Sequence, residues 1–518
     1  QSADCAIGFE AANAVLMCLS AFKDDMEAHL QGRCTGSFAA PVPCVHDCPA
    51  HVDVPGYLAL VRDGRYADAV RLIRKDNPLV AVCGYICEHP CEEHCRRRDI
   101  DDAINIRGIK RFAAEHAGDV LPPKPADATG KSVCIVGGGP CGLSAAYYLS
   151  LMGHSVTLYE AHDELGGMLR YGIPAYRLPR EILDTEINAI LANGVTVRLN
   201  DNPTRDGFTS MIEDYDATLL AIGCQNAGAL GIDGEDAKGV MSAVEMLGVY
   251  GGPDKLDFTG EDVVVVGGGN VAVDVARTAL RSGANKVTMA YRRRRADMTA
   301  QDAEIGSAVE EGVELLELAK PVRVEVDGNG HAAGLWVKPQ MAGLVQRGRP
   351  SPVDNGEAEY MLEATRVLVA VGQQVDSGEF EEHNLTDKRG RFTCGSTTHF
   401  GDVGGLRGVF AGGDAATGPA TAIRAIAAGK VAAANIDEYL GYNHEISVDV
   451  DIPDARLGTI LASGRANMPE RPSGVRAHDY DEVECPLNAT EATAEASRCL
   501  RCDHFGFGAF REGREASW

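Results

Sequence analysis

The sequence predicts an α/β protein in which two doubly wound, Rossmann-like units follow a cysteine-rich head. The units are predicted by a pattern that occurs near Val133 and again near Val263: an apolar strand, a glycine-rich turn and a helical segment. The head is predicted by seven cysteines between Cys34 and Cys95. A length of 518 residues agrees with this organisation, since it corresponds to about three domains of ~150 residues.

The charge balance excludes several classes of protein. The chain has 49 Lys and Arg against 75 Asp and Glu, a formal net charge of −26, which argues against general binding to nucleic acid or to an anionic membrane. The apolar stretch from Ala11 to Phe22 is far shorter than the ~20 residues of a membrane-spanning helix, and its flanking charges are unlike those of a signal peptide. We therefore expect a cytoplasmic protein whose 16 cysteines serve metal or redox chemistry rather than a disulfide framework.

The first glycine-rich turn has the spacing G-x-G-x-x-G, at Gly137, Gly139 and Gly142. In such a turn the first glycine permits the bend, the second lets the backbone approach a pyrophosphate at the helix N-terminus, and the third lets helix and strand pack closely. Glu160 ends the next apolar strand, 23 residues beyond Gly137, where an acid accepts hydrogen bonds from a ribose. This order of features predicts a dinucleotide site rather than an ordinary glycine turn.

The second turn repeats the design, with alanine in place of the third glycine. Its predicted nucleotide-binding residues are Gly267, Gly269, Asn270 and Val271. Here the acid is absent, and the next strand ends at a run of arginines that begins with Arg292 and Arg293. Arginine pairs with a ribose 2′-phosphate that an acid would repel, so this site is predicted to prefer NADP(H) to NAD(H). The alternative is a solvated run of surface charge, which the position at a strand end makes less attractive.

A third glycine-rich segment, Gly412-Gly413-Asp414, follows another short apolar strand. Its acid could bind the ribityl chain of a flavin. The N-terminus of the following alanine-rich helix, near Thr421 and Ala422, could stabilise negative charge at the pyrimidine end of reduced flavin. Two dinucleotide sites in one chain imply a resident flavin and a diffusible nicotinamide.

Four segments carry a family resemblance: Gly166–Pro174, Asp216–Gly223, Tyr291–Arg294 and Gly412–Asp414. Together they resemble the small (β) subunit of NADPH-dependent glutamate synthase and its relatives, which include the N-terminal half of dihydropyrimidine dehydrogenase and the large subunit of ferredoxin:NADP transhydrogenases. The resemblance covers about residues 36–445. It implies an FAD domain interrupted by an NAD(P)H domain, with a helical iron–sulfur domain in front, and further FAD contacts from Pro140, Gly167, Gly223 and Gly413.

Composition and resemblance together predict the domain boundaries. Proline- and glycine-rich stretches near 121–125 and 251–260 separate the segments. We expect an N-terminal extension at 1–35, a helical iron–sulfur domain at 36–125, the FAD domain at 126–250 and 373–445, the NAD(P)H domain at 251–372 and a tail at 446–518.

The head resembles the same family through six of its cysteines, Cys44, Cys48, Cys83, Cys87, Cys91 and Cys95. Thiolates at this density suit iron–sulfur clusters, whereas the spacing is a poor match to zinc sites built from Cys-x2-Cys and histidine pairs. Four cysteines between head and tail, Cys134, Cys141, Cys224 and Cys394, stand singly and are most simply small core residues.

The chain departs from its family in one place. Relatives usually have a Cys-x2-Cys ahead of Cys44, but here that pair is found in the tail, as Cys499 and Cys502. We expect the tail pair to fold back and complete a [4Fe–4S] cluster with Cys44 and Cys95, since such a cluster normally takes four protein ligands. The alternatives are a redox disulfide, a separate cluster with Cys485, and pairing with a neighbouring chain.

A second cluster would use Cys48, Cys87 and Cys91 with a fourth ligand that the spacing does not fix. Cys83 is the nearest candidate. The position at which relatives use a side-chain oxygen falls near Lys110, which is a poor ligand while charged.

These features predict a flavin and iron–sulfur electron-transfer subunit. NAD(P)H would deliver hydride to FAD, and single electrons would pass through two [4Fe–4S] clusters to a partner subunit or a ferredoxin-like protein, because nicotinamide moves electrons in pairs and clusters move them singly. Three kinds of partner complex stay open: one that makes glutamate, one that reduces ferredoxin by electron bifurcation, and one that contains a hydrogenase or formate dehydrogenase. Two other interpretations are a thioredoxin-reductase-like disulfide reductase that uses Cys499 and Cys502, and a non-catalytic scaffold.

Overall fold

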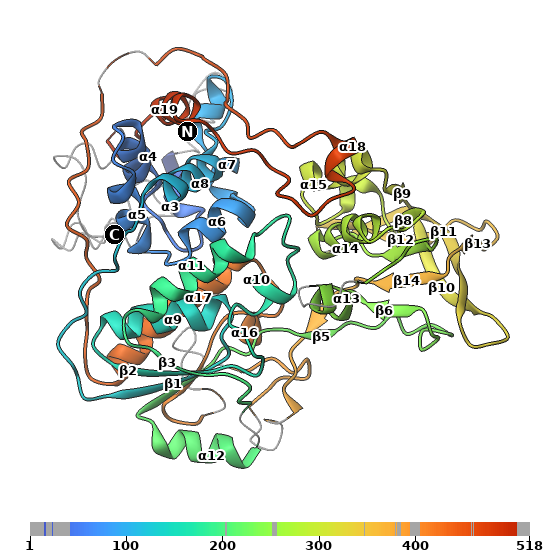
Figure 1. Ribbon diagram of the computed structural model, residues 1–518, viewed down its shortest axis with the longest axis horizontal. Helices are drawn as coiled ribbons and strands as arrows, with labels where there is room; N and C mark the ends of the chain where they lie inside the picture. The colour runs from blue at the N-terminus through green and yellow to red at the C-terminus, as the bar shows by residue number, and fades with distance from the viewer. Residues whose placement is uncertain are drawn as a thin grey trace.

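The computed structural model describes residues 42–504 except for 203–204, 251–255, 347, 379, 381–384, 394–402, 404, 457 and 459, together with Val15, Leu16 and Lys23. The expected extension at 1–35 lies almost wholly outside the described residues, and so do Cys34 and Cys394. The described part forms a helical lobe, a lobe around one parallel sheet, and a lobe around a second parallel sheet (Figure 1). Within these ranges no helix is both long and apolar enough to span a membrane.

The helical lobe is built from short helices around a core of aliphatic and aromatic side chains. Two helices begin at capping side chains: Asp53 accepts a hydrogen bond from Gly56 N (3.0 Å), and Asn105 accepts one from Gly108 N (2.9 Å). The helices are α3 (Pro43–His46), α4 (Val54–Arg62), α5 (Tyr66–Arg74), α6 (Val80–Ile86), α7 (Pro90–Glu93), the 3₁₀ turn η1 (Arg96–Asp99) and α8 (Ile106–His116).

The first sheet is parallel, in the order β16-β4-β1-β2-β3. Two long helices pack against each other and against this sheet, and their contact depends on Gly429, where a Cβ would lie 2.2 Å from Cys141 O. The strands are β1 (Ser132–Val136), β2 (Ser155–Tyr159), β3 (Thr196–Arg198), β4 (Ala217–Leu220) and β16 (Val409–Ala411). The helices are α9 (Pro140–Leu151), α10 (Met168–Tyr171), α11 (Arg180–Leu191), α12 (Arg205–Asp214), α16 (Asp414–Thr417) and α17 (Ala422–Tyr439).

One buried carboxylate joins this sheet lobe to the helical lobe. Glu186 on α11 accepts hydrogen bonds from Ala81 N (2.9 Å) and Val82 N (2.8 Å) in the first turn of α6. Its carboxylate thus satisfies the N–H groups that a helix start leaves unpaired. Burial raises the pKa of Glu186 to about 7, against the opposing effect of these hydrogen bonds.

The second parallel sheet is inserted into the first lobe between β4 and β16. Its order is β6-β14-β7-β8-β9. The chain crosses to it through β5 (Asn226–Ala227) and returns through β15 (Gln373–Gln374), which pair antiparallel. The elements are β6 (Val240–Ser242), α13 (Ala243–Tyr250), β7 (Asp262–Val266), α14 (Asn270–Arg281), β8 (Lys286–Ala290), η2 (Arg295–Asp297), α15 (Asp302–Glu311), β9 (Glu314–Leu316) and β14 (Arg366–Val369).

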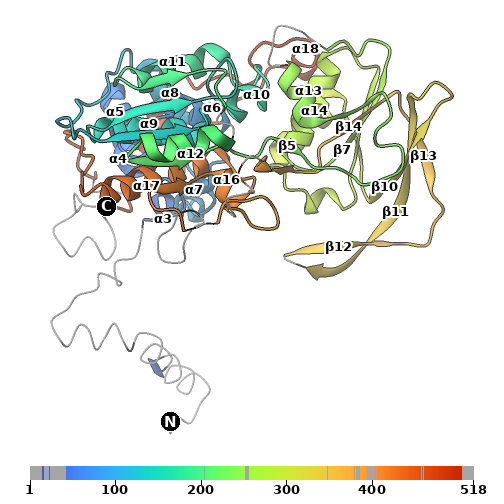
Figure 2. The ribbon, with the colours of Figure 1, turned by 90° about the horizontal axis from the view of Figure 1, so that it is seen from below.

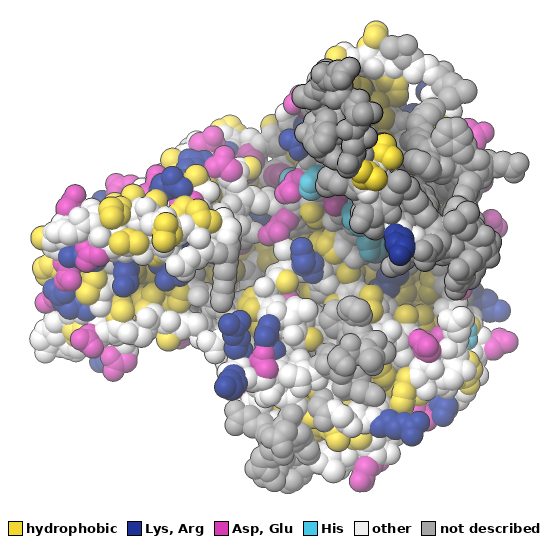
Figure 3. Space-filling model, turned by 180° about the vertical axis from the view of Figure 1, so that it is seen from behind, with side chains coloured by type: hydrophobic (Ala, Val, Ile, Leu, Met, Phe, Trp, Pro, Cys, Tyr) yellow, Lys and Arg dark blue, Asp and Glu magenta, His cyan; other side chains and the backbone are white. Residues whose placement is uncertain are grey.

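An antiparallel sheet extends from this second lobe, away from the rest of the molecule (Figure 2). It consists of β10 (Ala319–Val326), β11 (Ala332–Gln346), β12 (Arg349–Asp354) and β13 (Tyr360–Glu363). On the face seen in Figure 3, Lys and Arg side chains of the second lobe stand among Asp and Glu side chains and exposed apolar groups. The expected fold class is confirmed: two Rossmann-like units, one inserted in the other, behind a helical domain.

The C-terminal segment after α17 runs along the outside of the helical lobe, crosses to the second lobe at α18 (Ser473–Arg476) and returns to α19 (Ala489–Ser497), as Figure 1 shows. Helix α19 begins with a reciprocal capping arrangement between Asn488 and Glu491, in which each side chain accepts from the other residue's N–H. It packs against α4 and α8.

A buried cluster of charges fixes α18 to the second lobe. Glu311 at the end of α15 has no exposed side-chain surface and accepts from Arg277 Nη2 (2.7 Å), Arg281 Nη1 (2.7 Å) and Arg476 Nε (2.9 Å). Burial works against the ionised form, but the arginines outweigh it and lower the pKa of Glu311 to about 2.

Candidate functional site

The first glycine turn lies at the carboxyl end of β1 and opens a cavity of about 360 Å³. Gly137 has φ +108°, and a Cβ there would lie 2.5 Å from Ala221 O. A Cβ at Gly142 would lie 1.9 Å from Gly137 O, so the third glycine serves helix packing. Gly139 lies at the start of α9, and a Cβ there would have only one neighbour within 4 Å, at 3.9 Å. The backbone is therefore open where a pyrophosphate would approach.

Glu160, buried at the end of β2, lines the same cavity. Its Oε2 accepts a hydrogen bond from Gly138 N (2.8 Å), and its Oε1 accepts one from His162 N (2.9 Å). These two backbone bonds fix the position of the carboxylate, while each oxygen keeps a free lone pair. The carboxylate can thus accept hydrogen bonds from ribose hydroxyls.

The third glycine segment brings Asp414 to the same cavity, beside the other residues that the sequence assigns to FAD. Burial raises the pKa of Asp414 to about 6. Such a buried acid fits a partner that supplies hydroxyl donors, as a ribityl chain does. The predicted residues that line this cavity are Gly137, Gly139, Pro140, Glu160, Gly167, Gly223 and Asp414.

Three further predicted residues lie beside this cavity rather than in its lining. Gly413 has φ +64° and precedes α16, and a Cβ there would lie 2.9 Å from Cys141 Cβ. Thr421 is the N-cap of α17 and lines a different, larger cavity, and Ala422 is the first residue of that helix. From α17, Ala425 lines the smaller cavity.

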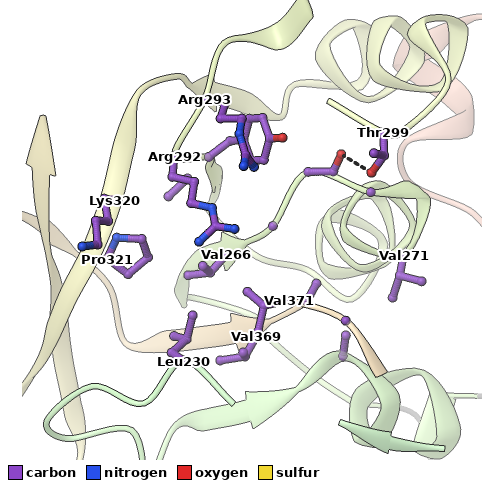
Figure 4. Close-up of a pocket in the computed structure, with 18 of the residues that line it drawn as sticks. Leu230, Val266, Val271, Arg292, Arg293, Thr299, Lys320, Pro321, Val369 and Val371 are labelled. Atoms are coloured by element: carbon purple, nitrogen blue, oxygen red, sulfur yellow. Dashed lines mark hydrogen bonds between the residues drawn. The ribbon is translucent and has the colours of Figure 1, made fainter. Parts of the chain in front are cut away.

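The larger cavity, of about 1250 Å³, lies over the second glycine turn, with Gly267, Gly269, Asn270 and Val271 in its lining. Gly267 has φ +156°, and a Cβ there would lie 2.5 Å from Ala370 O. Arg292 extends from the end of β8 into this cavity toward Val266 (Figure 4). The cavity therefore presents a dinucleotide turn and an exposed guanidinium at the expected place.

The remaining arginines of the run have structural partners. Arg293 lines the cavity, and its Nε donates to Pro350 O (2.9 Å), which fixes the start of β12. Arg294 pairs with Asp297 (2.8 Å) and Arg295 with Asp302 (2.9 Å). Of the four arginines in this run, the first two thus line the larger cavity.

Three cations that sequence reasoning missed also line the larger cavity, and they come from the antiparallel extension: Lys320, Lys338 and Arg349. Their strands lie far beyond the glycine turn in the sequence, and no local motif identifies these three residues. The antiparallel extension thus contributes positive charge to the same cavity as Arg292.

The larger cavity also connects the three lobes. Glu88 of the helical lobe lines it and accepts a hydrogen bond from Asn270 Nδ2 (2.7 Å). Pro419, Ala420 and Thr421 of the first sheet lobe line it from another side. Glu88 directly follows Cys87, so the second glycine turn is bonded to the loop that carries one of the predicted cluster ligands.

Two groups of cysteines form in and around the helical lobe. In the first, Cys48, Cys83, Cys87 and Cys91 gather near the buried ammonium of Lys110. Burial works to lower the pKa of Lys110, but the thiolate forms of Cys87, Cys83, Cys91 and Cys48 outweigh it and raise that pKa. His89 N donates to Cys87 Sγ (3.4 Å).

The second group combines head and tail. Burial is the largest effect that raises the pKa of the Cys44 thiol. Four neighbouring thiols raise it further: those of Cys499, Cys91, Cys95 and Cys502. In the described part of the chain these cysteines are free thiols. Two groups of thiols flanked by cations fit the anionic iron–sulfur clusters that a head of this composition predicts.

Comparison with known proteins identifies two families that match consecutive parts of the chain. Residues 131–429 match the pyridine nucleotide-disulphide oxidoreductase family, and residues 17–120 match the 4Fe–4S cluster domain II of dihydropyrimidine dehydrogenase. Cys499 and Cys502 lie outside both matched ranges. Among solved structures, a mutant of FprA from Mycobacterium tuberculosis has a TM-score of 0.52 at 20% identity over 60% of this chain and 85% of that chain, which shows a similar fold.

Curated relatives are similar over most of the chain. The NADP(+)-dependent formate dehydrogenase β subunit of Moorella thermoacetica is 38% identical, over 90% of this chain and 71% of the relative. The NADPH-Fe(3+) oxidoreductase β subunit of Geobacter sulfurreducens is 34% identical, over 94% and 80%. The NADPH glutamate synthase small chain of Escherichia coli is 32% identical, over 77% and 88%.

Proposed function

This chain belongs to the family of NADPH oxidoreductases with FAD and iron–sulfur clusters that includes the glutamate synthase small chain, and we propose that it takes electrons from NADPH and passes them singly to a partner subunit. The cofactors FAD, NAD(P)H and [4Fe–4S] follow from the matched family models. FAD, when bound, exchanges electron pairs with nicotinamide and single electrons with clusters.

The observation that carries this proposal is the lining of the larger cavity. It is bounded by the second glycine turn, by Pro419, Ala420 and Thr421 before α17, and by Glu88 next to Cys87. A nicotinamide nucleotide on that turn would meet the flavin lobe and the iron–sulfur lobe at one place. Such an arrangement suits a chain that connects a two-electron donor to one-electron carriers.

We assign FAD to the smaller cavity. The turn from Gly137 to Gly142 would receive the pyrophosphate, Glu160 would bind a ribose, and Asp414 would bind the ribityl chain. The N-terminus of α17, with Thr421 as N-cap, carries unpaired N–H groups and the positive end of an 18-residue helix. Those groups would stabilise negative charge at the pyrimidine end of the flavin.

We assign NADPH to the larger cavity. Arg292 is exposed and points into the cavity, so its guanidinium is available for a 2′-phosphate, and Arg293 stands beside it. Lys320, Lys338 and Arg349 add positive charge from the antiparallel extension. Asn270, at the start of α14, is oriented by its bond to Glu88.

The electron acceptor is proposed from the relatives. Two of them are named as β subunits, one of a formate dehydrogenase and one of an Fe(3+) oxidoreductase. We therefore propose that this chain also works beside a partner that receives electrons from the clusters. Electron bifurcation is one mode that the proposed cofactor set allows.

A self-contained disulfide reductase is less well supported. Such an enzyme needs its dithiol beside the flavin. Among the described residues, none from 441–504 lines either cavity, whereas Cys499 and Cys502 lie by the helical lobe beside Cys44 and Cys95.

An anaerobic titration of the purified full chain tests the proposed function. NADPH should bleach the flavin absorbance near ~450 nm, and a one-electron acceptor such as ferricyanide should restore it over many cycles. Failure of NADPH to bleach bound FAD would refute the oxidoreductase proposal and favour a scaffold. Bleaching that is restored only by a disulfide substrate would favour the reductase.

A further inference from the structure

The tail is fixed to the helical lobe immediately before its two cysteines. Glu495 of α19 accepts from Asn105 N through Oε1 (2.8 Å) and from Ala466 N through Oε2 (2.8 Å). Arg498 donates to Asp101 (2.8 Å), and its carbonyl oxygen accepts from Arg97 Nη1 (3.3 Å). The side chains of Arg97, Glu495 and Arg498 are almost completely buried. The backbone that leads into Cys499 is therefore held in one place by paired buried charges.

This anchoring brings the tail thiols to two cysteines of the head. Cys499 and Cys502 of the tail, together with Cys91 and Cys95 of the head, are electrostatic neighbours of Cys44. Cys95 in turn is a neighbour of both Cys499 and Cys502. Cys44, Cys95 and Cys499 also pack, partly buried, against the same apolar core.

The backbone at Cys499 repeats the backbone at Cys87. Two residues after Cys499, Arg501 has φ +53°, and its N–H donates to Cys499 Sγ (3.5 Å). Two residues after Cys87, His89 has φ +45°, and its N–H donates to Cys87 Sγ (3.4 Å). Positive φ is uncommon outside glycine, and in both places it occurs at the residue whose N–H donates to the sulfur. An N–H aimed at a cysteine sulfur stabilises the thiolate of an iron–sulfur ligand.

The competing tail partner lies elsewhere. Cys485 is held by its N–H, which donates to Pro469 O (2.8 Å), and it lies near Arg471. The adjacent Glu484 is bound by Arg107 (2.5 Å). The thiols that the electrostatics link to Cys499 are those of Cys502, Cys95 and Cys44, whereas Cys485 is linked to Arg471.

We propose that Cys44, Cys95, Cys499 and Cys502 hold one [4Fe–4S] cluster, so that the tail supplies two ligands to the head. Assembly of a [4Fe–4S]²⁺ core takes up two Fe²⁺, two Fe³⁺ and four S²⁻; four Fe–S bonds form to the protein, and four thiol protons leave to solvent. Four thiolates on a [4Fe–4S]²⁺ core leave a net charge of about −2, and Arg96, a neighbour of Cys502, faces that charge. This inference rests on the proposed function only in placing clusters in the head.

The test compares iron and acid-labile sulfide per full-length chain. The variant C499S/C502S should lose about four irons per chain relative to the wild type and keep its FAD content. Cys485→Ser is the matched control, because it removes a tail thiol outside the proposed set, and its iron content should be unchanged. Unchanged iron in C499S/C502S, or an equal loss in Cys485→Ser, would overturn the proposal.

A third variant separates one shared cluster from two independent ones. Cys44→Ser should lose the same about four irons, and adding it to C499S/C502S should remove no more, because all three thiols bind the same cluster. Additive loss would overturn the proposal. A fall in FAD content would show that the variants fold poorly, and limited proteolysis of the wild type then replaces them as the test. Chelation of iron should expose residues 489–504 to cleavage. Continued protection of these residues would overturn the proposal.

These outcomes are distinct from a failure of the proposed function. The iron counts and proteolysis do not depend on NADPH. Flavin bleaching by NADPH in the wild-type chain tests the oxidoreductase proposal without reference to the tail.

Discussion

Asp414 should make the flavin lobe less stable at neutral pH than in mild acid when FAD is absent. Burial raises the pKa of this carboxyl from 3.8 to about 6, and a shift of that size corresponds to about 3 kcal/mol at ~1.4 kcal/mol per unit. Because the pKa is raised on folding, the carboxyl favours the folded state fully below about pH 4 and loses that contribution as the pH rises through about 6.

Asp414→Asn removes the charge and keeps an acceptor oxygen. In FAD-depleted protein at pH 7.5 the variant should therefore be more stable than the wild type by up to about 3 kcal/mol, and by about half of that at pH 5. Native-state hydrogen exchange of amides in β1 and β4 measures this lobe without requiring the whole chain to unfold in one step. Exchange in the variant should slow by up to about a hundredfold at pH 7.5.

Asp201→Asn is the control, because Asp201 is a second carboxyl that lines the same cavity. We expect it to change stability by no more than about 0.5 kcal/mol at either pH. An equal change at pH 5 and 7.5 in Asp414→Asn, or faster exchange at pH 7.5, would contradict this role of the Asp414 carboxyl.

Three other variants test separate parts of the molecule. Arg292→Ala should weaken NADPH binding by about 2 kcal/mol and leave NADH binding almost unchanged, and equal losses in calorimetric titrations would contradict a phosphate-binding role. Glu160→Ala should yield protein depleted in FAD that keeps most of its iron, because the head folds around its own thiols; normal flavin content would mean that the two cavities are wrongly assigned. Glu311→Gln should destabilise the second lobe by about 3 to 5 kcal/mol at neutral pH, since it leaves buried arginines without their carboxylate, and an unchanged urea midpoint would contradict this.

The two dinucleotide units could be predicted from sequence because their requirements are local. The positive φ at Gly137 and the missing space for a Cβ at Gly142 are imposed by residues of the same turn and its strand, and the spacing of the glycines records them. The fold class and the cofactors followed from these turns and from the family resemblance.

Other parts of the site have no local signature. Lys320 and Arg349 lie 28 and 57 residues beyond Arg292, and only the folding of the antiparallel extension brings them to its cavity. Glu88 looks like an ordinary surface acid between two cysteines until Asn270 is placed against it. Likewise, the run of arginines in the sequence does not reveal that Arg294 and Arg295 form ion pairs with Asp297 and Asp302.

The route of the C-terminal segment has a mechanical consequence for the inserted lobe. Two adjacent crossings, β5 and β15, would by themselves act as a hinge about a single axis. The attachment of α18 through Arg476 to Glu311 is a third point of support that lies off this axis, as Figure 1 shows. Rotation about the hinge must therefore break a buried ion pair or move the whole tail with it. We therefore expect this buried ion pair to resist rotation of the inserted lobe, and with it any change in the spacing between the two cavities.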